Sequence, residues 1–346
     1  MAVLAVATSS PPGIEGGHLI VARALVAAAR ESGHDARLVI TPDFGFGRLS
    51  SSYWNTWWMD VRRLGGTPVD QVISLRYPSF ALRHPAHVCW LNHTMREYYD
   101  LWPHFAKSIS IKNRVKESVR KTLLHAADRW LLRQNVTRVV AQSRTIQRRL
   151  DEAFNLRADV LLPPPPPRAY RCDAYGDYIF APSRLTPLKR VELLVRPLAE
   201  PAARGVRAVV AGDGEERANL EALAAALGVA DRVTFAGWTD DAAMVDHLAR
   251  CRAVCFTPYA EDYGLVTAEA FASGKAVITC RDSGGPVELV RHEETGLVCD
   301  ATPRSLADAL ARIIADRALA ERLGAAAAAR AATMTWADAV SRLLIV

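Results

Sequence analysis

The hydrophobic pattern of the chain alternates short apolar runs with longer stretches of helical periodicity. A helix is predicted from about His18 to Ser32, where Gly33 ends it. In the first half, apolar runs bounded by turn residues or helices predict strands at Ala2–Thr8, Arg37–Thr41, Val69–Leu75, Ala86–Leu91 and Arg138–Gln142. Repeated strand–helix units of this kind predict a parallel sheet with right-handed crossovers.

Five consecutive prolines, Pro163–Pro167, interrupt this pattern. They cannot donate ladder hydrogen bonds and favour a stiff extended segment, so we interpret them as a linker, with a ligand for another protein as the alternative. The alternation then restarts, with strands predicted at Tyr178–Ala181, Arg207–Ala211, Val233–Ala236, Ala253–Phe256, Ala276–Thr279 and Leu297–Cys299. Helices are predicted near Asn219–Leu227, Ala318–Ala332 and Trp336–Ile345.

The length of 346 residues suits two domains better than one core. We expect an α/β fold of two doubly wound Rossmann-like domains facing across a cleft, spanning residues 1–162 and 168–332 and joined by the linker 163–167. The last segment, 333–346, is expected to be a helix that returns to the first domain. Ligands of open α/β sheets bind at the carboxyl ends of the strands, which places a small-molecule site in the cleft.

Charge is unevenly distributed along the chain. Residues 1–165 carry 22 Lys and Arg against 13 Asp and Glu, and segment 105–150 alone carries 12 against two. A basic face of this kind suggests phosphate, a phospholipid surface or a nucleic acid as partner. Within it, Lys116–Gln134 is predicted to be a helix whose apolar face comprises Val119, Leu123, Leu124, Ala127, Trp130 and Leu131. That face either packs on the sheet, as in an ordinary domain helix, or lies on an anionic membrane.

Two features indicate a cytoplasmic protein. Six cysteines are scattered without metal spacing or a paired framework, which suits buried thiols in a reducing compartment. Charges break every apolar stretch well before 18 residues, so no transmembrane helix is expected, and Met1–Thr8 resembles a strand more than a signal peptide. Peripheral attachment to the inner face of the membrane remains an option through the basic segment.

The segment Glu261–Ala270, of sequence EDYGLVTAEA, is the most informative for chemistry. Glu261 lies in a loop after a predicted strand, and Glu269 lies about one turn inside the helix that follows. Gly264 allows close backbone approach where that helix begins, and the first-turn amides would point at a site suited to phosphate. By spacing alone, an acidic loop followed by a solvated glutamate is the simpler interpretation.

The same segment resembles the E-x7-E signature of retaining GT-B glycosyltransferases of family 4, the glycosyl transferases group 1. Further segments match this family in its order and nearly fill residues 178–300: Ser183–Arg190, Gly237–Met244, Ala272–Cys280, Ser283–Val290 and Glu294–Asp300. In the first domain, Ser9–Leu25 resembles the family's glycine-rich loop, and Trp90–Trp102 resembles the loop that carries a histidine over the donor sugar.

The resemblance implies roles for individual residues. Arg184 and Lys189 would hold the donor diphosphate and stabilise the charge of the leaving group. Glu261 would bind sugar hydroxyls, and Glu269 the ribose hydroxyls. Backbone from four residues would hold sugar and phosphate: Tyr263, Gly264, Leu265 and Val266. In the first domain, Gly16 and Gly17 would approach the diphosphate, and His93 would lie beside the reacting carbon; taken alone, a Gly-Gly turn and a histidine after a strand are ordinary structural features.

The implied activity is metal-independent, retaining transfer of a sugar from a GDP- or UDP-linked donor to a hydroxyl acceptor, in the synthesis of bacterial cell-surface glycans or glycoconjugates. No cofactor beyond the nucleotide sugar is expected. The acceptor would be a glycan or a lipid-linked molecule. No marked carboxylate nucleophile is evident, so we expect front-face attack by the acceptor.

Four alternatives compete with this interpretation. Another GT-B enzyme, such as a sugar-nucleotide epimerase or a phosphorylase, is the first alternative, and a catalytically silent sugar-binding relative is the second. A dinucleotide-dependent oxidoreductase would need the G-x-G-x-x-G fingerprint, which the loop after the first strand lacks. No basic-aromatic module of the nucleic-acid binders is recognised, so no nucleic-acid partner is expected.

Overall fold

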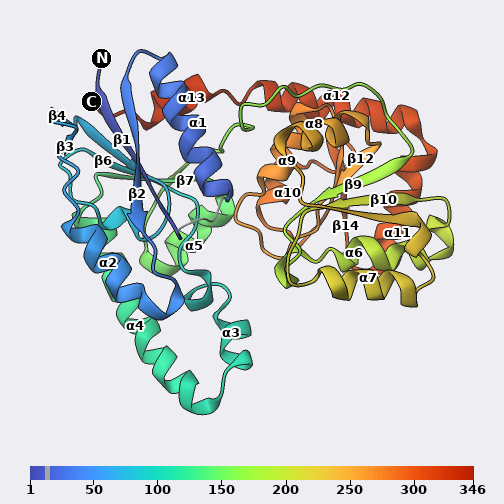
Figure 1. The fold of residues 1–346 in the computed structure, drawn as a ribbon, viewed down its shortest axis with the longest axis horizontal. Coiled ribbons are helices and arrows are strands. Elements are labelled where there is room, and N and C mark those ends of the chain that lie inside the picture. Colours follow the sequence, from blue (N-terminus) through green and yellow to red (C-terminus); the bar gives the residue numbers. More distant parts are fainter. Residues whose placement is uncertain (12–15) are drawn as a thin grey trace. The chain divides into compact units, whose positions relative to one another are not determined.

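The computed structural model describes residues 1–11 and 16–346, and it divides the chain into two compact units (Figure 1). Unit 1 comprises Met1–Pro163 together with Thr335–Val346, and unit 2 comprises Pro164–Met334. The division after Pro163 falls inside the proline run. The middle of the expected glycine-rich loop, residues 12–15, lies outside the described residues, whereas Gly16 and Gly17 are described.

Unit 1 is built on a six-stranded sheet of order β2-β1-β5-β6-β7-β8, in which every neighbouring pair is parallel. Its strands are β1 (Val3–Ser10), β2 (Asp35–Pro42), β5 (Gln71–Ser74), β6 (His87–Leu91), β7 (Arg138–Ala141) and β8 (Asp159–Val160). A short antiparallel hairpin, β3 (Arg63–Leu64) with β4 (Thr67–Pro68), precedes β5. The parallel sheet expected from the strand–helix alternation is confirmed, while β8 and the hairpin were not predicted.

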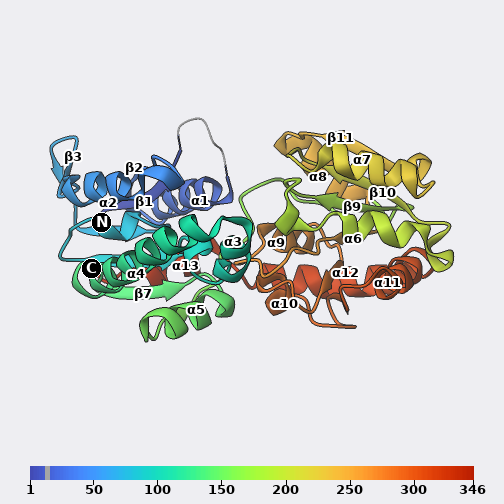
Figure 2. The ribbon, with the colours of Figure 1, turned by 90° about the horizontal axis from the view of Figure 1, so that it is seen from below.

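Helices cover both faces of this sheet (Figure 2). They are α1 (Gly17–Glu31), α2 (Leu49–Trp58), α3 (Trp102–Ser108), α4 (Ile111–Gln134), α5 (Arg144–Phe154) and α13 (Trp336–Leu343). Cys89 and Leu91 of β6 share a buried cluster with residues of α4 and α5. Trp90, between them, points to the other face, where its ring centroid lies 6.3 Å from that of Trp336 in α13. Side-chain alternation along one strand therefore requires helices on both faces.

The C-terminal segment is fastened to unit 1 by polar contacts. Gln71, buried on β5, donates from Nε2 to the carbonyl of Leu343 at 2.8 Å and accepts from the amide of Ile345 at 2.9 Å. Arg138 of β7 donates to the carbonyl of Arg342 at 2.8 Å. These bonds satisfy backbone groups at the end of α13 that the helix itself leaves unpaired.

Unit 2 has a second six-stranded parallel sheet, of order β11-β10-β9-β12-β13-β14. Its strands are β9 (Tyr178–Pro182), β10 (Arg207–Ala211), β11 (Val233–Gly237), β12 (Ala253–Cys255), β13 (Val277–Cys280) and β14 (Gly296–Cys299). The helices are α6 (Glu192–Val195), α7 (Arg217–Ala226), α8 (Asp241–Arg250), α9 (Leu265–Ala272), α10 (Gly285–Leu289), α11 (Pro303–Ala315) and α12 (Arg317–Ala332).

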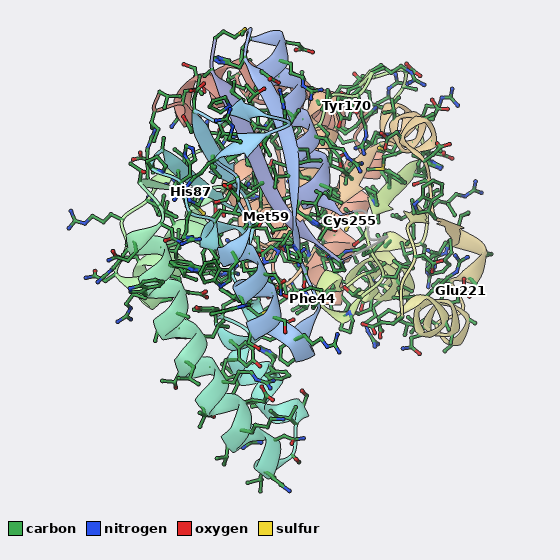
Figure 3. All side chains as sticks on the ribbon, turned by 60° about the vertical axis from the view of Figure 1, so that its left-hand side comes forward. Phe44, Met59, His87, Tyr170, Glu221 and Cys255 are labelled. Carbon is green, nitrogen blue, oxygen red and sulfur yellow. The ribbon has the colours of Figure 1, made fainter. Side chains whose placement is uncertain are left out.

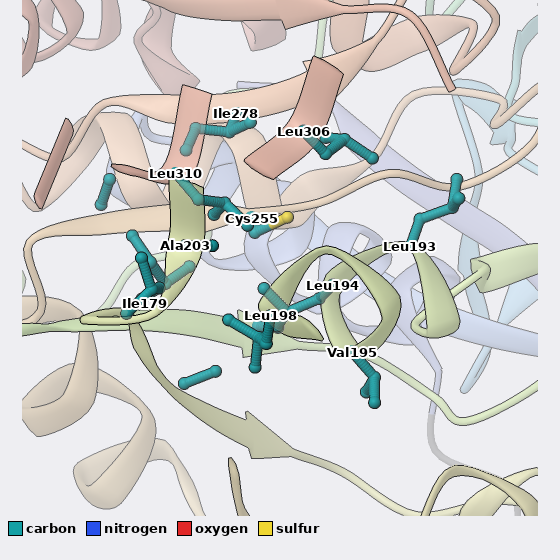
Figure 4. Packing of buried hydrophobic residues seen from close by; sticks show 14 of the residues in the cluster. Ile179, Leu193, Leu194, Val195, Leu198, Ala203, Cys255, Ile278, Leu306 and Leu310 are labelled. Carbon is teal, nitrogen blue, oxygen red and sulfur yellow. The ribbon is translucent and has the colours of Figure 1, made fainter. Parts of the chain in front are cut away.

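The core of unit 2 shows the same two-faced packing. Ile179 and Ala181 of β9 belong to a buried cluster that α6, α7, α11 and α12 complete (Figure 4). Phe180 points to the opposite face and stacks on His247 of α8, with ring centroids 4.9 Å apart. Strand β9 is therefore apolar on both sides, which explains why it appears in the sequence as a continuous apolar run.

Helix α4 departs from the sequence prediction. It begins at Ile111, and Leu124 and Leu131 are buried. Val119 and Leu123, however, are 58% and 67% exposed, and Trp130 is 51% exposed. The prediction of one shared apolar face was wrong, because these residues lie on two sides of the helix. Among the helices of the described residues, none has the length and apolarity required to cross a membrane.

Acid is expected to destabilise unit 1 through His87, which is fully buried on β6 (Figure 3). Its Nε2 lies 2.8 Å from the hydroxyl of Ser74, and burial lowers its pKa to about 4 from 6.5. The unfolded chain therefore binds a proton below about pH 6.5 that the folded chain excludes, and this contribution to stability is lost as the pH falls from 6.5 toward 4.

Urea denaturation at pH 7 and pH 5 measures this effect. We expect His87 to account for a loss of about 2 kcal/mol between these two values. The His87→Gln variant, which cannot titrate there, should lose correspondingly less stability on acidification, although it starts from a lower value at pH 7. Equal losses in the two proteins would contradict the assignment.

Candidate functional site

The charged residues of unit 2 that the sequence predicts to bind the donor lie after two neighbouring strands. Strand β9 lies between β10 on one side and β12 on the other, so the strand order reverses at the boundary between β9 and β12. Arg184 and Lys189 follow β9, and Glu261 and Gly264 follow β12. Parallel strands end at the same edge of the sheet, and a reversal of strand order at that edge is where ligands of doubly wound sheets bind.

An ion pair joins the two loops at this edge. Lys189 Nζ lies 2.6 Å from Glu261 Oε2, and the two side chains are 14% and 19% exposed. The ammonium nitrogen also lies over the ring of Phe256, 5.4 Å from the ring centroid. The Lys189 loop is also held by its backbone, since the carbonyl of Leu188 accepts from the amide of Tyr259 at 2.7 Å. The cation and the acid are therefore placed before any ligand arrives.

Arg184 differs from Lys189 in being exposed, with no ion pair or hydrogen bond to its guanidinium among the residues that the structure describes. Its backbone is fixed by the turn after β10. Leu185 donates to the carbonyl of Asp213 at 2.9 Å, and a Cβ on Gly212 would lie 1.9 Å from the carbonyl oxygen of Ser183. A rigid backbone thus presents a free guanidinium.

Sequence reasoning missed this supporting turn. Gly212 and Gly214 have φ of 121° and 156° and flank Asp213 directly after a strand. A Cβ on Gly214 would lie 2.3 Å from the carbonyl oxygen of Leu185, so both positions require glycine. Two glycines around an acidic residue at a strand end were the available signal.

Gly264 starts α9 with φ 81° and ψ 72°, a left-handed conformation that favours glycine. The first bond of the helix runs from the amide of Thr267 to the carbonyl of Gly264 at 2.9 Å. The amides of Leu265 and Val266 precede that bond and have no acceptor within the helix. No acidic residue stands in the first turn of α9. These donors, with the positive end of the helix dipole, can bind an anion.

The loop before α9 is supported by the Ser283–Val290 segment. Ser283 accepts from the amide of Glu261 at 2.9 Å, and Gly285 donates to the carbonyl of Glu261 at 2.8 Å. A Cβ on Gly285 would lie 2.4 Å from the Cα of Tyr263, so the two backbones are in contact. Tyr263 is buried, and burial raises the pKa of its hydroxyl. Glu261 and the start of α9 therefore form one rigid unit.

Glu269 is buried inside α9, at 5% exposed, rather than solvated. Its Oε1 is paired with the guanidinium of Arg168 and lies 3.4 Å from the hydroxyl of Tyr170. Arg168 also donates to Asp241 at 2.8 Å. Sequence reasoning missed both Arg168 and Tyr170, because no local pattern links residues about a hundred positions apart. Among the residues that the structure describes, none hydrogen-bonds to Oε2, which leaves that oxygen as an acceptor for a ligand.

In unit 1, His93 follows β6 and is half-buried. Its Nδ1 lies 2.7 Å from the carbonyl of Thr94, which can only accept, so Nδ1 carries the proton and Nε2 presents a lone pair. Burial lowers its pKa to about 3, and the positive charges of Arg76, Arg96 and Arg149 act in the same direction. The imidazole is therefore neutral near pH 7 and can accept a hydrogen bond through Nε2.

Gly16 and Gly17 also lie in unit 1, where α1 begins after β1. Gly16 is the N-cap, in an extended conformation, and its carbonyl accepts from the amide of Leu19 at 2.9 Å. The first turn of α1 contains no acidic residue. His93, Gly16 and Gly17 thus belong to unit 1, whereas the other predicted site residues belong to unit 2.

Comparison with known proteins gives this site a family context. Residues 173–330 match the model of the family described as Glycosyl transferases group 1. Over 171 residues the chain is 36% identical to a D-inositol 3-phosphate glycosyltransferase of Nocardia farcinica, a match covering 46% of this chain and 38% of that protein. Over 129 residues it is 41% identical to the lipopolysaccharide core biosynthesis glycosyltransferase LpsE of Rhizobium meliloti, covering 36% and 37% respectively. The matches span less than half the length of these curated relatives.

Among solved structures, Anabaena HepE in complex with UDP and glucose resembles the chain over 98% of both molecules, with a TM-score of 0.69 and 17% identity. A likeness at that identity shows the fold. The predicted fold class, two doubly wound Rossmann-like domains of the GT-B type, is confirmed, and so is the predicted resemblance to the group 1 family.

The start of α9 should tolerate no side chain at position 264. In a Gly264→Ala variant, the new Cβ would meet Phe256 Cε1 at 2.8 Å and Pro286 Cγ at 3.0 Å, in addition to the cost of the left-handed backbone. We expect a loss of about 2–4 kcal/mol in the free energy of unfolding.

Gly228 provides the matched control, because it also has a left-handed φ of 66° but nothing lies within 4 Å of its added Cβ. Gly228→Ala should cost only about 1 kcal/mol. Urea denaturation of both variants measures the difference. Equal losses would mean that the close packing around Gly264 is not present in solution.

Proposed function

We propose that this chain, whose residues 173–330 belong to the glycosyl transferases group 1 family, transfers a sugar from a nucleotide-diphosphate donor to a hydroxyl acceptor. One observation carries the proposal. Arg184, the Lys189–Glu261 pair and the start of α9 all lie where β9 and β12 end. This set combines two cations and free amides for a diphosphate with a carboxylate for sugar hydroxyls.

The donor would bind by exchanging partners within the site. A phosphate oxygen that binds beside Lys189 accepts the hydrogen bond that its ammonium donates to Glu261 in the absence of ligand. Glu261 is then free to accept hydrogen bonds from the sugar. The amides of Leu265 and Val266 donate to the same diphosphate. Glu269, already oriented by Arg168, accepts from the ribose hydroxyls through Oε2. UDP and glucose in the related HepE structure support a UDP-linked donor, with a GDP-linked donor as the alternative.

Charge stabilisation of the leaving group is the main catalytic contribution in this proposal. As the sugar–phosphate bond breaks, negative charge grows on the nucleoside diphosphate. Arg184 and Lys189, fixed by their loops, stabilise that charge without reorganising. They take the place of a divalent metal, so we propose that transfer is metal-independent.

We further propose that the anomeric configuration is retained by front-face attack. In the donor complex proposed above, the carboxylate of Glu261 accepts hydrogen bonds from sugar hydroxyls, which makes it a poor nucleophile. The acceptor hydroxyl would instead approach on the side of the leaving group, and the departing phosphate would take its proton. His93, neutral and with Nε2 as an acceptor, would bind a donor-sugar hydroxyl beside the reacting carbon.

The cysteines and one relative bear on where the reaction takes place. All six cysteines are free and five of them are buried, which is compatible with a reducing cytoplasm. The matched LpsE of Rhizobium meliloti is named for lipopolysaccharide core biosynthesis, which supports a lipid-linked or glycan acceptor and a role in cell-surface glycan synthesis.

Donor binding tests the proposal most directly. Thermal shift with UDP, GDP and their sugar conjugates should raise the melting temperature for at least one base, because a ligand of the folded state stabilises it by mass action. Arg184→Ala and Lys189→Ala should each weaken that binding by about tenfold or more and lower kcat about 10²–10³-fold. His93→Ala and Glu261→Ala should also lose turnover while remaining folded.

Arg207→Ala is the matched control, since Arg207 is an exposed arginine at the opposite end of β10. The Arg207→Ala variant should bind the nucleoside diphosphate and transfer the sugar as the unmodified protein does. Near-normal turnover in Lys189→Ala would remove the diphosphate assignment. No shift with any nucleoside diphosphate would remove the proposed activity.

The stereochemical proposal has its own measurement. Proton NMR of the first product formed should show the donor's anomeric configuration, and intact-protein mass spectrometry with donor alone should show no added sugar. An inverted product would exclude the retaining mechanism. A covalent glycosyl adduct would replace front-face attack by double displacement.

A further inference from the structure

Helix α4 presents apolar side chains to solvent along its length. Ile111, Val115, Val119 and Leu123 succeed one another at intervals of four residues and are 58–77% exposed, and Trp130 follows at 51%. Residues four apart lie on one side of a helix, so they form a continuous ridge. A helix of 24 residues spans about 36 Å. In Figures 1 and 3 the first turns of α4 extend beyond the sheet of unit 1.

The acidic residues of α4 face the opposite way. The helix contains only two, Glu117 and Asp128, and both are buried. Asp128 accepts hydrogen bonds from the hydroxyls of Tyr53 and Tyr99, each at 2.6 Å, and burial raises its pKa to about 6. Glu117 is bound by the Tyr98 hydroxyl and by Arg120. No carboxylate of this helix is therefore available to its exposed side.

Cations flank the ridge on that exposed side. Lys112, Lys116, Arg129 and Arg133 are exposed, and their spacing places them beside the apolar residues rather than opposite them. The outer side of α4 thus combines an apolar ridge with positive charge only. This pattern suits a surface that offers both a hydrocarbon layer and negative head groups.

Tryptophans of α2 extend the same surface. Trp57 packs against Trp130 with ring centroids 5.2 Å apart, which joins α2 to α4. Its neighbours Trp54 and Trp58 are 65% and 58% exposed. Tryptophan is enriched at the boundary between membrane and water because its ring is apolar and its N–H is polar. We call the set Ile111, Val115, Val119, Leu123, Trp130, Trp54 and Trp58 the α4 face.

We propose that the α4 face docks the protein on an anionic lipid bilayer, which rests on the proposed function by bringing the donor site to a lipid-linked acceptor. A second copy of this chain is a poorer occupant. A symmetric dimer through this face would oppose the same cations of both copies and bury them without carboxylates from α4. Anionic lipid head groups supply the missing negative charge.

Vesicle sedimentation tests the proposal with the whole chain. Vesicles containing phosphatidylglycerol and phosphatidylcholine should bind the protein at least tenfold more tightly than phosphatidylcholine alone, and salt should weaken the binding. Leu123→Glu should reduce the affinity more than tenfold. Each of Lys116→Gln and Arg133→Gln should reduce it about fivefold.

Two control variants alter exposed residues outside the α4 face. Ile40→Glu on β2 adds the same charge as Leu123→Glu, and Arg148→Gln on α5 removes the same kind of charge as Arg133→Gln. Both should bind vesicles normally. Nucleoside diphosphates should raise the melting temperature of every variant as much as that of the unmodified protein. If they fail to raise it in the unmodified protein, the proposed function fails, whereas the vesicle measurements still decide docking.

Three results would overturn the proposal. The first is equal or absent binding to the two kinds of vesicle, and the second is unchanged binding of Leu123→Glu. The third is a concentration-dependent dimer in analytical ultracentrifugation that Leu123→Glu dissociates, because it would assign the α4 face to a second copy.

Discussion

The ion pair between Lys189 and Glu261 is the interaction on which the site of unit 2 depends. It joins the loops that follow two adjacent parallel strands, and each loop alone would place a single charge at the edge of the sheet. Both side chains are half-buried, and without a ligand the ammonium and the carboxylate hydrogen-bond to each other. A ligand can replace this pair if it brings a better partner for each of the two charges. A diphosphate and a sugar are such partners, since one brings negative charge and the other brings hydroxyl donors.

Backbone contacts hold the two loops that carry this pair. Gly212 and Gly214 lie against the backbone of Ser183 and Leu185, and Gly285 lies against Tyr263. Because these contacts join main chain to main chain, the loops cannot shift independently, and the amides at the start of α9 are held in place. Preorganised donors of this kind stabilise developing charge at little cost in reorganisation.

Helix α4 follows a different distribution of polarity from the rest of the protein. Most helices place apolar residues inward and charges outward. In α4 two tyrosine hydroxyls satisfy Asp128 inside the domain, while the ridge from Ile111 to Leu123 remains exposed. Burying a carboxylate is costly unless it is hydrogen-bonded, so the tyrosines make this arrangement possible. The arrangement leaves the outer side of the helix suited to a partner that is apolar and anionic.

The sequence by itself determined the parallel sheets, because strands buried on both faces appear as apolar runs; Arg207–Ala211 was predicted with its observed bounds. It also carried the resemblance to the glycosyl transferases group 1 family over residues 173–330, since the motifs of unit 2 are local and ordered. The tertiary structure decided what depends on distant contacts: Arg168 reaching Glu269, the low pKa of His93, and which side of α4 faces the core. A helix with apolar residues on two sides does not reveal its buried side by periodicity, because burial is set by neighbours that fold against it from elsewhere in the chain.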